Sequence, residues 1–241
     1  MRALDKFFGQ ICVINLRSRP DRRREMHAQL ERVGLGLDSA NVLLFEADKP
    51  SDAGGFPSRG ARGCFMSHLA VLRAARDQGV ESVLILEDDL NFCADFPARF
   101  DAVASHLERH GWGMLHGVYA CPGAAAPDCG EPCVRVDPGL AIETSPFVAV
   151  HGRWIGLLVD YLEAMLARAP GDPRGGPMHV DGAYCWFRRE HPQLPTWLAS
   201  PPLGYQRSSR TDVHALQWWD RHAGPAWLVA LLRRRRNRYR R

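Results

Sequence analysis

Residues 82–92, SVLILEDDLNF, decide the fold that this sequence predicts. The first five form the most apolar strand pattern of the chain, typical of a strand buried in the middle of a sheet. Three carboxylates, Glu87, Asp88 and Asp89, follow at once. Because the ligand crevice of an α/β sheet lies beyond the carboxyl ends of its strands, the stretch predicts a central strand that ends in an acidic site.

Strand and helix patterns alternate on both sides of this stretch. Short apolar runs predict strands, and apolar residues at helical spacing, bounded by Pro, Asp or Gly, predict helices. The predicted strands are 11–16, 42–47, 82–86, 114–119, 140–144 and 147–150, and the predicted helices are 20–33, 64–78, 95–110, 156–169 and 180–190. This alternation predicts an α/β fold with a mostly parallel central sheet flanked by helices.

Composition and charge predict one soluble globular domain with a basic tail. The chain has 241 residues, 46% of them hydrophobic and 24% charged. Its last nine residues, 233–241, carry seven arginines, whereas the rest holds 24 basic and 27 acidic residues. We therefore expect a domain over 1–215 and a tail over 216–241. Specific nucleic-acid binding is not expected, because the positive charge is not spread over a folded face.

The tail combines apolar and basic residues. Tryptophan, leucine and valine side chains between 218 and 232 precede the arginines, a pattern that suits a helix on an anionic membrane surface, where each basic residue contributes ~1 kcal/mol. The alternative is a frayed basic end that touches nucleic acid nonspecifically. We expect a cytoplasmic protein, peripheral on the inner face of the membrane, since no apolar run reaches the ~20 residues that span a bilayer.

The seven cysteines are expected to be reduced thiols. Their number is odd, and no signal-peptide pattern precedes them, which favours a cytoplasmic protein without disulfides. Cys121, Cys129 and Cys133 lie in a loop rich in proline and glycine. A zinc site there is an alternative, but their spacing matches no recognised ligand pattern, so incidental cysteines are favoured.

Taken alone, the acidic run at residues 87–89 has two interpretations of equal weight. Carboxylates at a strand end suit Mg²⁺ or Mn²⁺ shared with phosphate oxygens, or they form a solvated strand end. A glycine-rich segment, 54–63, leads into the helix that carries Ser67 and His68. Such a loop suits a phosphate or ribose, because the N–H groups at a helix start are free.

Three blocks of the sequence together resemble a known family. They are CVINLRSRPDRR (12–23), RGCFMSHLAVLRAA (62–75) and LILEDDLNF (84–92), and their order and spacing are similar to those of glycosyltransferase family 25. This family of lipopolysaccharide glycosyltransferases also includes the procollagen galactosyltransferases. Looser resemblances follow at residues 179–181, HVD, and 205–212, YQRSSRTD.

The resemblance implies a GT-A-like nucleotide-sugar fold, a UDP-sugar donor, often UDP-galactose, and inversion at the anomeric carbon. It implies that Asp88 and Asp89 hold the divalent metal and the diphosphate. The implied donor-binding residues are Asn15, Arg17, Ser67, His68, Gln206 and Arg207. The family block usually opens with Gly-Glu-x-Gly-Cys, whereas this chain has Ala61 at the second position, so one expected acid is missing.

An acceptor hydroxyl needs a general base within hydrogen-bond reach. The resemblance places Asp181 across the crevice, and we expect it to be that base; a metal or sugar contact is its alternative role, and Glu87 is the alternative base. Arg207 and Arg210 are expected either to balance the diphosphate or to lie in solvent. His179 and His214 are expected to be structural.

The sequence therefore predicts a metal-assisted glycosyltransferase acting on a lipopolysaccharide or another surface glycan. A catalytically inactive binding or adhesion protein on the same fold is the main alternative, because of the residue at position 61. The carboxylates alone would also fit a metal-dependent enzyme acting on phosphate esters. The acceptor side is expected to be built from the loops 120–138 and 171–177.

Overall fold

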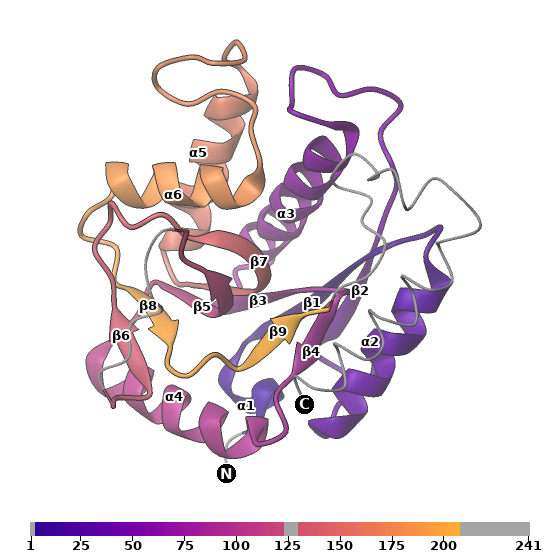
Figure 1. The fold of residues 1–241 in the computed structure, drawn as a ribbon, viewed down its shortest axis with the longest axis vertical. Helices are drawn as coiled ribbons and strands as arrows, with labels where there is room; N and C mark the ends of the chain where they lie inside the picture. Colours follow the sequence, from indigo (N-terminus) through magenta and orange to yellow (C-terminus); the bar gives the residue numbers. More distant parts are fainter. Residues whose placement is uncertain (1–2, 123–129, 208–241) are drawn as a thin grey trace.

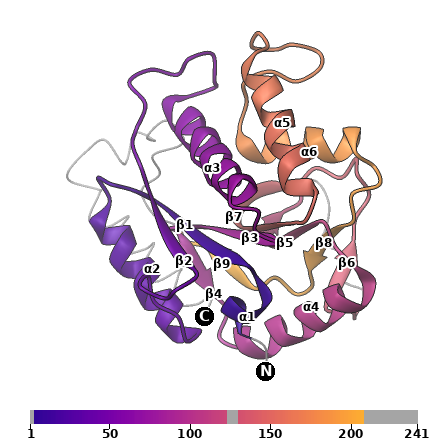
Figure 2. The same cartoon turned by 180° about the vertical axis from the view of Figure 1, so that it is seen from behind.

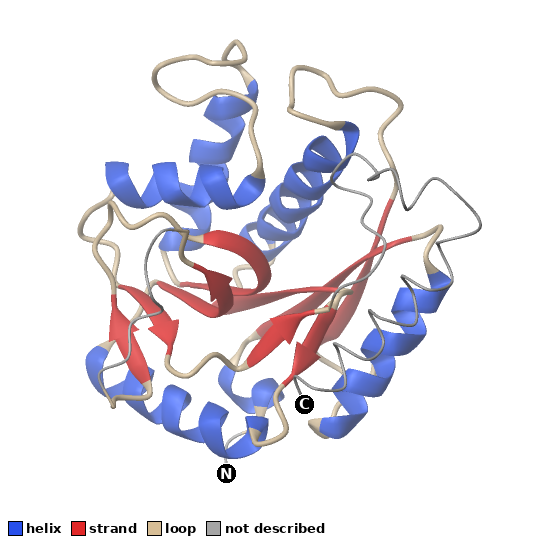
Figure 3. Ribbon diagram, viewed as in Figure 1, coloured by secondary structure: helices blue, strands red, loops and turns tan. Residues whose placement is uncertain are grey.

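The computed structural model describes residues 3–122 and 130–207. Its strands are β1 (Gln10–Leu16), β2 (Val42–Ala47), β3 (Ser82–Glu87), β4 (Leu90–Phe92), β5 (Met114–Ala120), β6 (Cys133–Arg135), β7 (Glu143–His151), β8 (Thr196–Ala199) and β9 (Gly204–Gln206). Its helices are α1 (Leu4–Phe7), α2 (Pro20–Arg32), α3 (Arg59–Asp77), α4 (Phe96–His110), α5 (Trp154–Leu166) and α6 (Val180–Glu190). Strands and helices are distinguished by colour in Figure 3.

A seven-stranded sheet forms the centre of the molecule, in the order β2-β1-β3-β7-β5-β8-β6. The pairs β1–β2, β1–β3 and β5–β8 are parallel, while β7 and β6 run against their neighbours. Five strands therefore share one direction and two oppose it, which confirms the predicted α/β class. The small β4–β9 sheet lies beside this framework and is antiparallel.

Helices cover both faces of the central sheet. Figures 1 and 2 show α3, α5 and α6 on one face and α1, α2 and α4 on the other. Successive side chains of β3 point to opposite faces of the sheet, so this one apolar strand packs against the helices on both faces. Leu84 and Leu86 pack in the cluster with α1, α2 and α4, whereas Val83 and Ile85 pack in the cluster with α3, α5 and α6. All four side chains are fully buried.

The glycine-rich segment before α3 corrects one expectation. The helix begins at Arg59, five residues before the predicted start, because the Ser58 hydroxyl caps it by accepting a hydrogen bond from the Ala61 amide at 3.0 Å. Gly60 and Gly63 therefore lie inside the helix. Their amides belong to a helical turn, and the predicted phosphate-binding loop does not extend beyond residue 58.

The predicted strands 140–144 and 147–150 are also wrong in part, because β7 is one continuous strand from Glu143 to His151. Pro146 lies inside this strand, although proline cannot donate to a sheet ladder. The chain accommodates it where the β5–β7 register shifts between Val118 and Ala120. The short strands β4, β6, β8 and β9 have three or four residues each and fall in segments expected to be loops or left unassigned.

Several expectations fall outside the described residues. These concern Cys129, Arg210, His214 and the tail over 216–241, including its boundary with the predicted domain. Cys121 and Cys133 are free thiols. Within residues 3–122 and 130–207, no helix is long and apolar enough to cross a membrane.

The buried His116 of β5 predicts acid sensitivity. Burial, with a smaller effect from the Arg188 charge, lowers the pKa of His116 from 6.5 to about 3. Below pH 6.5 His116 is therefore protonated in the unfolded chain, whereas in the folded chain it stays neutral down to about pH 3. The free energy of unfolding therefore falls as the pH is lowered from 6.5 to 3. We expect a loss of about 2 kcal/mol between pH 7 and pH 5. Denaturant unfolding at the two pH values measures it, and His116→Leu should remove that part of the loss; an unchanged pH dependence would contradict it.

Candidate functional site

A cavity of about 850 Å³ opens at the carboxyl ends of β1, β2 and β3, where the sequence pattern placed the ligand crevice. The first turns of α3 and α6, the end of β9 and residues 141–145 complete its described wall. Carboxylates and cations share this wall. The acids are Glu87, Asp88, Asp89, Glu143 and Asp181, and the cations are Arg22, Lys49, Arg59, Arg189 and Arg207.

The three consecutive acids after β3 have separate partners. The Asp88 carboxylate accepts a hydrogen bond from the Asn15 amide at 2.7 Å and from the Arg22 guanidinium at 2.9 Å. Asp89 lies 3.3–3.4 Å from the Gln206 amide nitrogen. Glu87 instead contacts residues of α3. Although one short motif supplies all three carboxylates, Asp88 and Asp89 are the two that lie beside Arg22.

Arg22 is the cation that the protein itself provides for this pair. Its Nη1 lies 2.9 Å from Asp88 Oδ1 and 3.6 Å from Asp89 Oδ2, and the three side chains are only 8–12% exposed. Burial raises the pKa of Asp88, an effect that Arg22 opposes. Burial followed by the Glu87 charge raises the pKa of Asp89. The repulsion expected among the acids is thus partly offset by Arg22.

Asn15 and Arg17, two of the implied donor-binding residues, are not among the residues that line the described cavity. Asn15 is fully buried and lies behind the described cavity wall. Its amide donates to Asp88 and to the Arg19 carbonyl, and its oxygen accepts from Arg23. Arg17 is exposed and pairs with the exposed Asp48 at 3.5 Å. Asn15 therefore positions Asp88. A direct contact of Asn15 or Arg17 with the nucleotide stays a prediction.

The end of β9 closes over the acidic turn. The Arg207 amide donates to the Asp89 carbonyl at 2.6 Å, and its guanidinium donates to the Asp88 carbonyl at 2.7 Å and to Asn91 at 2.9 Å. It also pairs with Glu25 of α2 at 2.9 Å. Arg207 thus holds the acidic turn by hydrogen bonds and also forms part of the cavity wall. The alternative that Arg207 lies in solvent is wrong, because its side chain is only 10% exposed.

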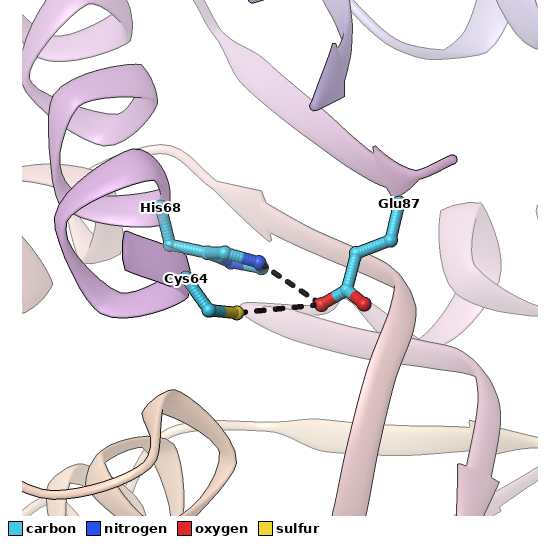
Figure 4. A group of neighbouring side chains, drawn as sticks. All are labelled: Cys64, His68 and Glu87. Carbon is cyan, nitrogen blue, oxygen red and sulfur yellow. Dashed lines mark hydrogen bonds and ion pairs between the residues drawn. The ribbon is translucent and has the colours of Figure 1, made fainter. Parts of the chain in front are cut away.

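Glu87 forms a second group with two residues of α3 (Figure 4). Its Oε1 lies 3.3 Å from His68 Nε2 and 3.7 Å from Cys64 Sγ. The other ring nitrogen of His68 lies 2.8 Å from the Tyr184 hydroxyl on α6. Burial, followed by the negative charge of Glu87, raises the pKa of the Cys64 thiol well above its usual range. The three side chains of Cys64, His68 and Glu87 all line the cavity.

Ser67 and Asp181 line the cavity from opposite helices. The Ser67 hydroxyl donates to the Gly63 carbonyl within α3 at 2.7 Å. The Asp181 carboxylate accepts from the Thr144 amide at 3.0 Å and the Gly182 amide at 2.8 Å. Thr144 has a φ of 65°, which is strained for a β-branched residue. Asp181 therefore holds a strained residue at the start of β7 in place.

The cavity contains residues that sequence reasoning missed. Arg22, Cys64 and Thr144 line it, and Tyr184 orients His68 from behind. One signal was present in the sequence, because residues four apart such as Cys64 and His68 share a helix face. None of the described residues of the predicted acceptor loops lines the cavity, and the lining residues nearest to them in the sequence are 141–145 and 178–182.

The residue that differs from the family block does not face the cavity. Ala61 is fully buried and packs with Phe56 and Phe65 in the core beneath α3. The described cavity lining does not include it. In this chain, position 61 therefore contributes to the packing of the core.

Comparisons with known proteins agree with the resemblance. Residues 8–119 match the model of glycosyltransferase family 25, an LPS biosynthesis protein. The chain is 27% identical over 127 residues to the human inactive glycosyltransferase 25 family member 3, and 28% identical over 127 residues to procollagen galactosyltransferase 1-B of Xenopus laevis. Each match covers 45% of this chain and 21% of the relative, so the chain spans about a fifth of the length of these proteins.

A solved structure is similar over more of the chain at low identity. It is the glycosyltransferase involved in the glycosylation of the major capsid of PBCV-1, with 13% identity, a TM-score of 0.42 and coverage of 84% of this chain and 93% of that one. The family match rests instead on sequence, and it includes Arg22, Cys64, His68 and the acidic run after β3. The part of the chain that supplies these cavity residues, 8–119, is thus the part that matches the model of glycosyltransferase family 25.

Proposed function

We propose that this protein is a metal-assisted glycosyltransferase that transfers a sugar from a UDP-sugar to a saccharide acceptor. The observation that carries the proposal is the meeting of Asp88 and Asp89 with Arg22 and Arg207 in the wall of one cavity. Carboxylates suit a divalent cation, and arginines suit the oxygens of a diphosphate. A volume of about 850 Å³ also suits a ligand of nucleotide-sugar size.

The acidic pair fits Mn²⁺ or Mg²⁺ in its donor chemistry, because both cations prefer oxygen ligands. Asp88 already has one oxygen on Arg22 and the other on Asn15. Asp89 has longer contacts, 3.3–3.4 Å to Gln206 and 3.6 Å to Arg22. We therefore assign Asp89 as the main ligand and Asp88 as its positioned neighbour. When bound, the cation would neutralise charge on the departing nucleoside diphosphate.

The protein's own groups would act around this cation. Lys49 and Arg59 line the same wall and would attract the diphosphate. We propose Asp181 as the general base: its carboxylate is anchored by two backbone amides and keeps lone pairs that can take a proton from an acceptor hydroxyl. A metal or sugar-hydroxyl contact is its alternative role. Glu87, the alternative base, is already engaged by His68 and Cys64.

The finer points of the proposal concern substrate and location. We propose a hexose such as galactose as the donor sugar, inversion at the anomeric carbon, and a lipopolysaccharide or another surface glycan as the acceptor. The name of the frog relative supports galactose as the sugar, and the description of the family supports the lipopolysaccharide acceptor. We also propose that residues 233–241 bind the inner face of the cytoplasmic membrane. Co-sedimentation with anionic liposomes, with and without these residues, tests this; equal binding by both chains would contradict it.

The test of the function is UDP release from a panel of UDP-sugars in the presence of Mn²⁺, with and without a saccharide acceptor. We expect one sugar nucleotide to bind in a Mn²⁺-dependent manner and to release UDP. Asp89→Asn should weaken this binding by roughly a hundredfold, because it removes a charged ligand and keeps the shape. The matched control, Asp95→Asn, changes an exposed carboxylate outside the cavity and should bind normally. Absence of both binding and release would contradict the proposal.

A binding protein without turnover is the second candidate. The human and bovine relatives are named inactive or probable inactive members of the family. The same experiment separates the two functions, because an inactive protein would bind the UDP-sugar in the presence of Mn²⁺ and release no UDP. The Asp88–Asp89 pair retained in the cavity wall favours the active enzyme.

A further inference from the structure

We propose that Cys64, His68 and Glu87 bind a thiophilic divalent cation, with Zn²⁺ as the expected ion, at a site separate from the Asp88–Asp89 pair. One sulfur, one imidazole nitrogen and one carboxylate oxygen lie within 4.8 Å of one another. This is the only such group of potential ligands in the described part of the chain. Figure 4 shows the sulfur and the ring nitrogen pointing at the same carboxylate oxygen.

The distances match the edges of a tetrahedral zinc site. Zinc bonds of ~2.3 Å to sulfur and ~2.0–2.2 Å to nitrogen or oxygen separate sulfur from oxygen by about 3.6 Å and nitrogen from oxygen by about 3.4 Å. The corresponding distances here are 3.7 Å for Cys64 Sγ to Glu87 Oε1 and 3.3 Å for His68 Nε2 to the same oxygen. Two of the three distances between ligand atoms therefore have the lengths that a tetrahedral ion requires, and the third, from sulfur to nitrogen, is at most 4.8 Å.

The backbone and the surrounding groups hold this arrangement. Cys64 and His68 are four residues apart on α3, so they project from one face of a rigid helix. Glu87 ends β3, an interior strand of the sheet. Tyr184 contacts His68 Nδ1 at 2.8 Å, which is the kind of outer contact that fixes the ring of a metal-binding histidine and leaves Nε2 for the ion.

The chemistry of the three donors selects the ion. Thiolate and imidazole favour Zn²⁺ over Mg²⁺ or Mn²⁺, which prefer oxygen. A thiolate and a carboxylate together balance the charge of a dication in this buried place, where His68 is fully buried and the Glu87 side chain is 20% exposed. Without an ion, the Cys64 thiol can donate only a weak hydrogen bond to the Glu87 carboxylate.

Three protein ligands leave one position of a tetrahedral ion open. All three residues line the cavity, so that position would face the space proposed for the substrate. Closed structural zinc sites use four protein ligands, whereas catalytic sites keep such an open position for water or substrate. The ion expected here is therefore one that exchanges an oxygen ligand with the cavity.

Cobalt substitution tests the site directly, and it requires neither a sugar nucleotide nor activity. The full-length chain, reduced and stripped of metal, is titrated with Co²⁺ while thiolate-to-cobalt charge-transfer absorption is followed in the near ultraviolet. We expect the absorption to saturate at a single equivalent and to disappear when Zn²⁺ is added. Cys64→Ser should abolish it without unfolding the protein, as circular dichroism would verify.

Two further variants make the assignment specific. Tyr184→Phe should retain the absorption and weaken Co²⁺ binding by roughly 10- to 100-fold, because only the contact behind His68 is lost. Cys121→Ser alters another half-buried thiol and should bind Co²⁺ normally. The proposal is overturned if no thiolate absorption develops, if Cys64→Ser retains it, or if Cys121→Ser removes it. Because the readout is metal binding alone, its failure would leave UDP-sugar binding at Asp89 untouched.

Discussion

Replacing Arg22 by methionine is expected to lower the free energy of unfolding by about 3–5 kcal/mol. The change leaves the Asp88 carboxylate buried beside Asp89 without its cation, and removing one partner of a buried ion pair has a cost of this size. Arg22 and Asp88 are 9% and 8% exposed, and their closest atoms are 2.9 Å apart. Denaturant unfolding at neutral pH measures the loss.

The matched control is Arg73→Met, which breaks the Arg73–Glu163 pair between α3 and α5. These side chains are 41% and 37% exposed, so water screens the pair and we expect a loss below about 1 kcal/mol. A second control places Arg22→Met in a chain that already carries Asp88→Asn. The cost of losing Arg22 should shrink there, because one of the two buried carboxylates beside it is already neutral. Equal losses at Arg22 and Arg73 would refute the role assigned to the buried pair.

The same pair explains which part of the site the sequence could predict. Glu87, Asp88 and Asp89 follow an apolar strand, so residues 82–89 alone predicted a strand that ends in three acids. Their partners were not, because Arg22 and Asn15 lie 66 and 73 residues from Asp88 in the sequence. The contact depends on the register in which Ile14 of β1 lies opposite Glu87 of β3. No local pattern specifies that register.

The fold divides in a similar way. The strands β1, β2, β3 and β5 have six or seven residues, and their own apolar patterns predicted them. The strands β4 and β9 have three residues each, too few to form a periodic pattern, and each is a strand only because the other lies beside it. The start of α3 was missed for another reason, because the Ser58 cap and the burial of Ala61 outweigh the low helix propensity of its glycines.

The β4–β9 pair is the basis of the second large effect, the loss expected from Gly204→Ala. A Cβ at position 204 would lie 2.2 Å from the Asn91 carbonyl oxygen and 3.2 Å from Phe92 Cα. Both are backbone atoms of the paired strand and cannot rotate away. We expect a loss of about 1–3 kcal/mol or more in the free energy of unfolding, as for other overpacked positions.

Gly204→Ala should also impair the site, because β9 leads directly into Gln206 and Arg207. Pushing β9 away from β4 would loosen the hydrogen bonds from Arg207 to the carbonyls of Asp88 and Asp89. Mn²⁺-dependent UDP binding is therefore expected to weaken together with stability, and isothermal titration calorimetry on the folded variant measures the first of these.

The control for this substitution has the opposite sign. A Cβ at position 156 of α5 would have only Arg76 Cδ nearby, at 4.0 Å, so Gly156→Ala adds a methyl group without a clash. It should raise the free energy of unfolding by about 0.5–1 kcal/mol, because alanine is the better helix former, and leave UDP binding unchanged. If Gly204→Ala were as well tolerated as Gly156→Ala, the close approach of β9 to β4 would not be what holds Arg207 over the acidic turn.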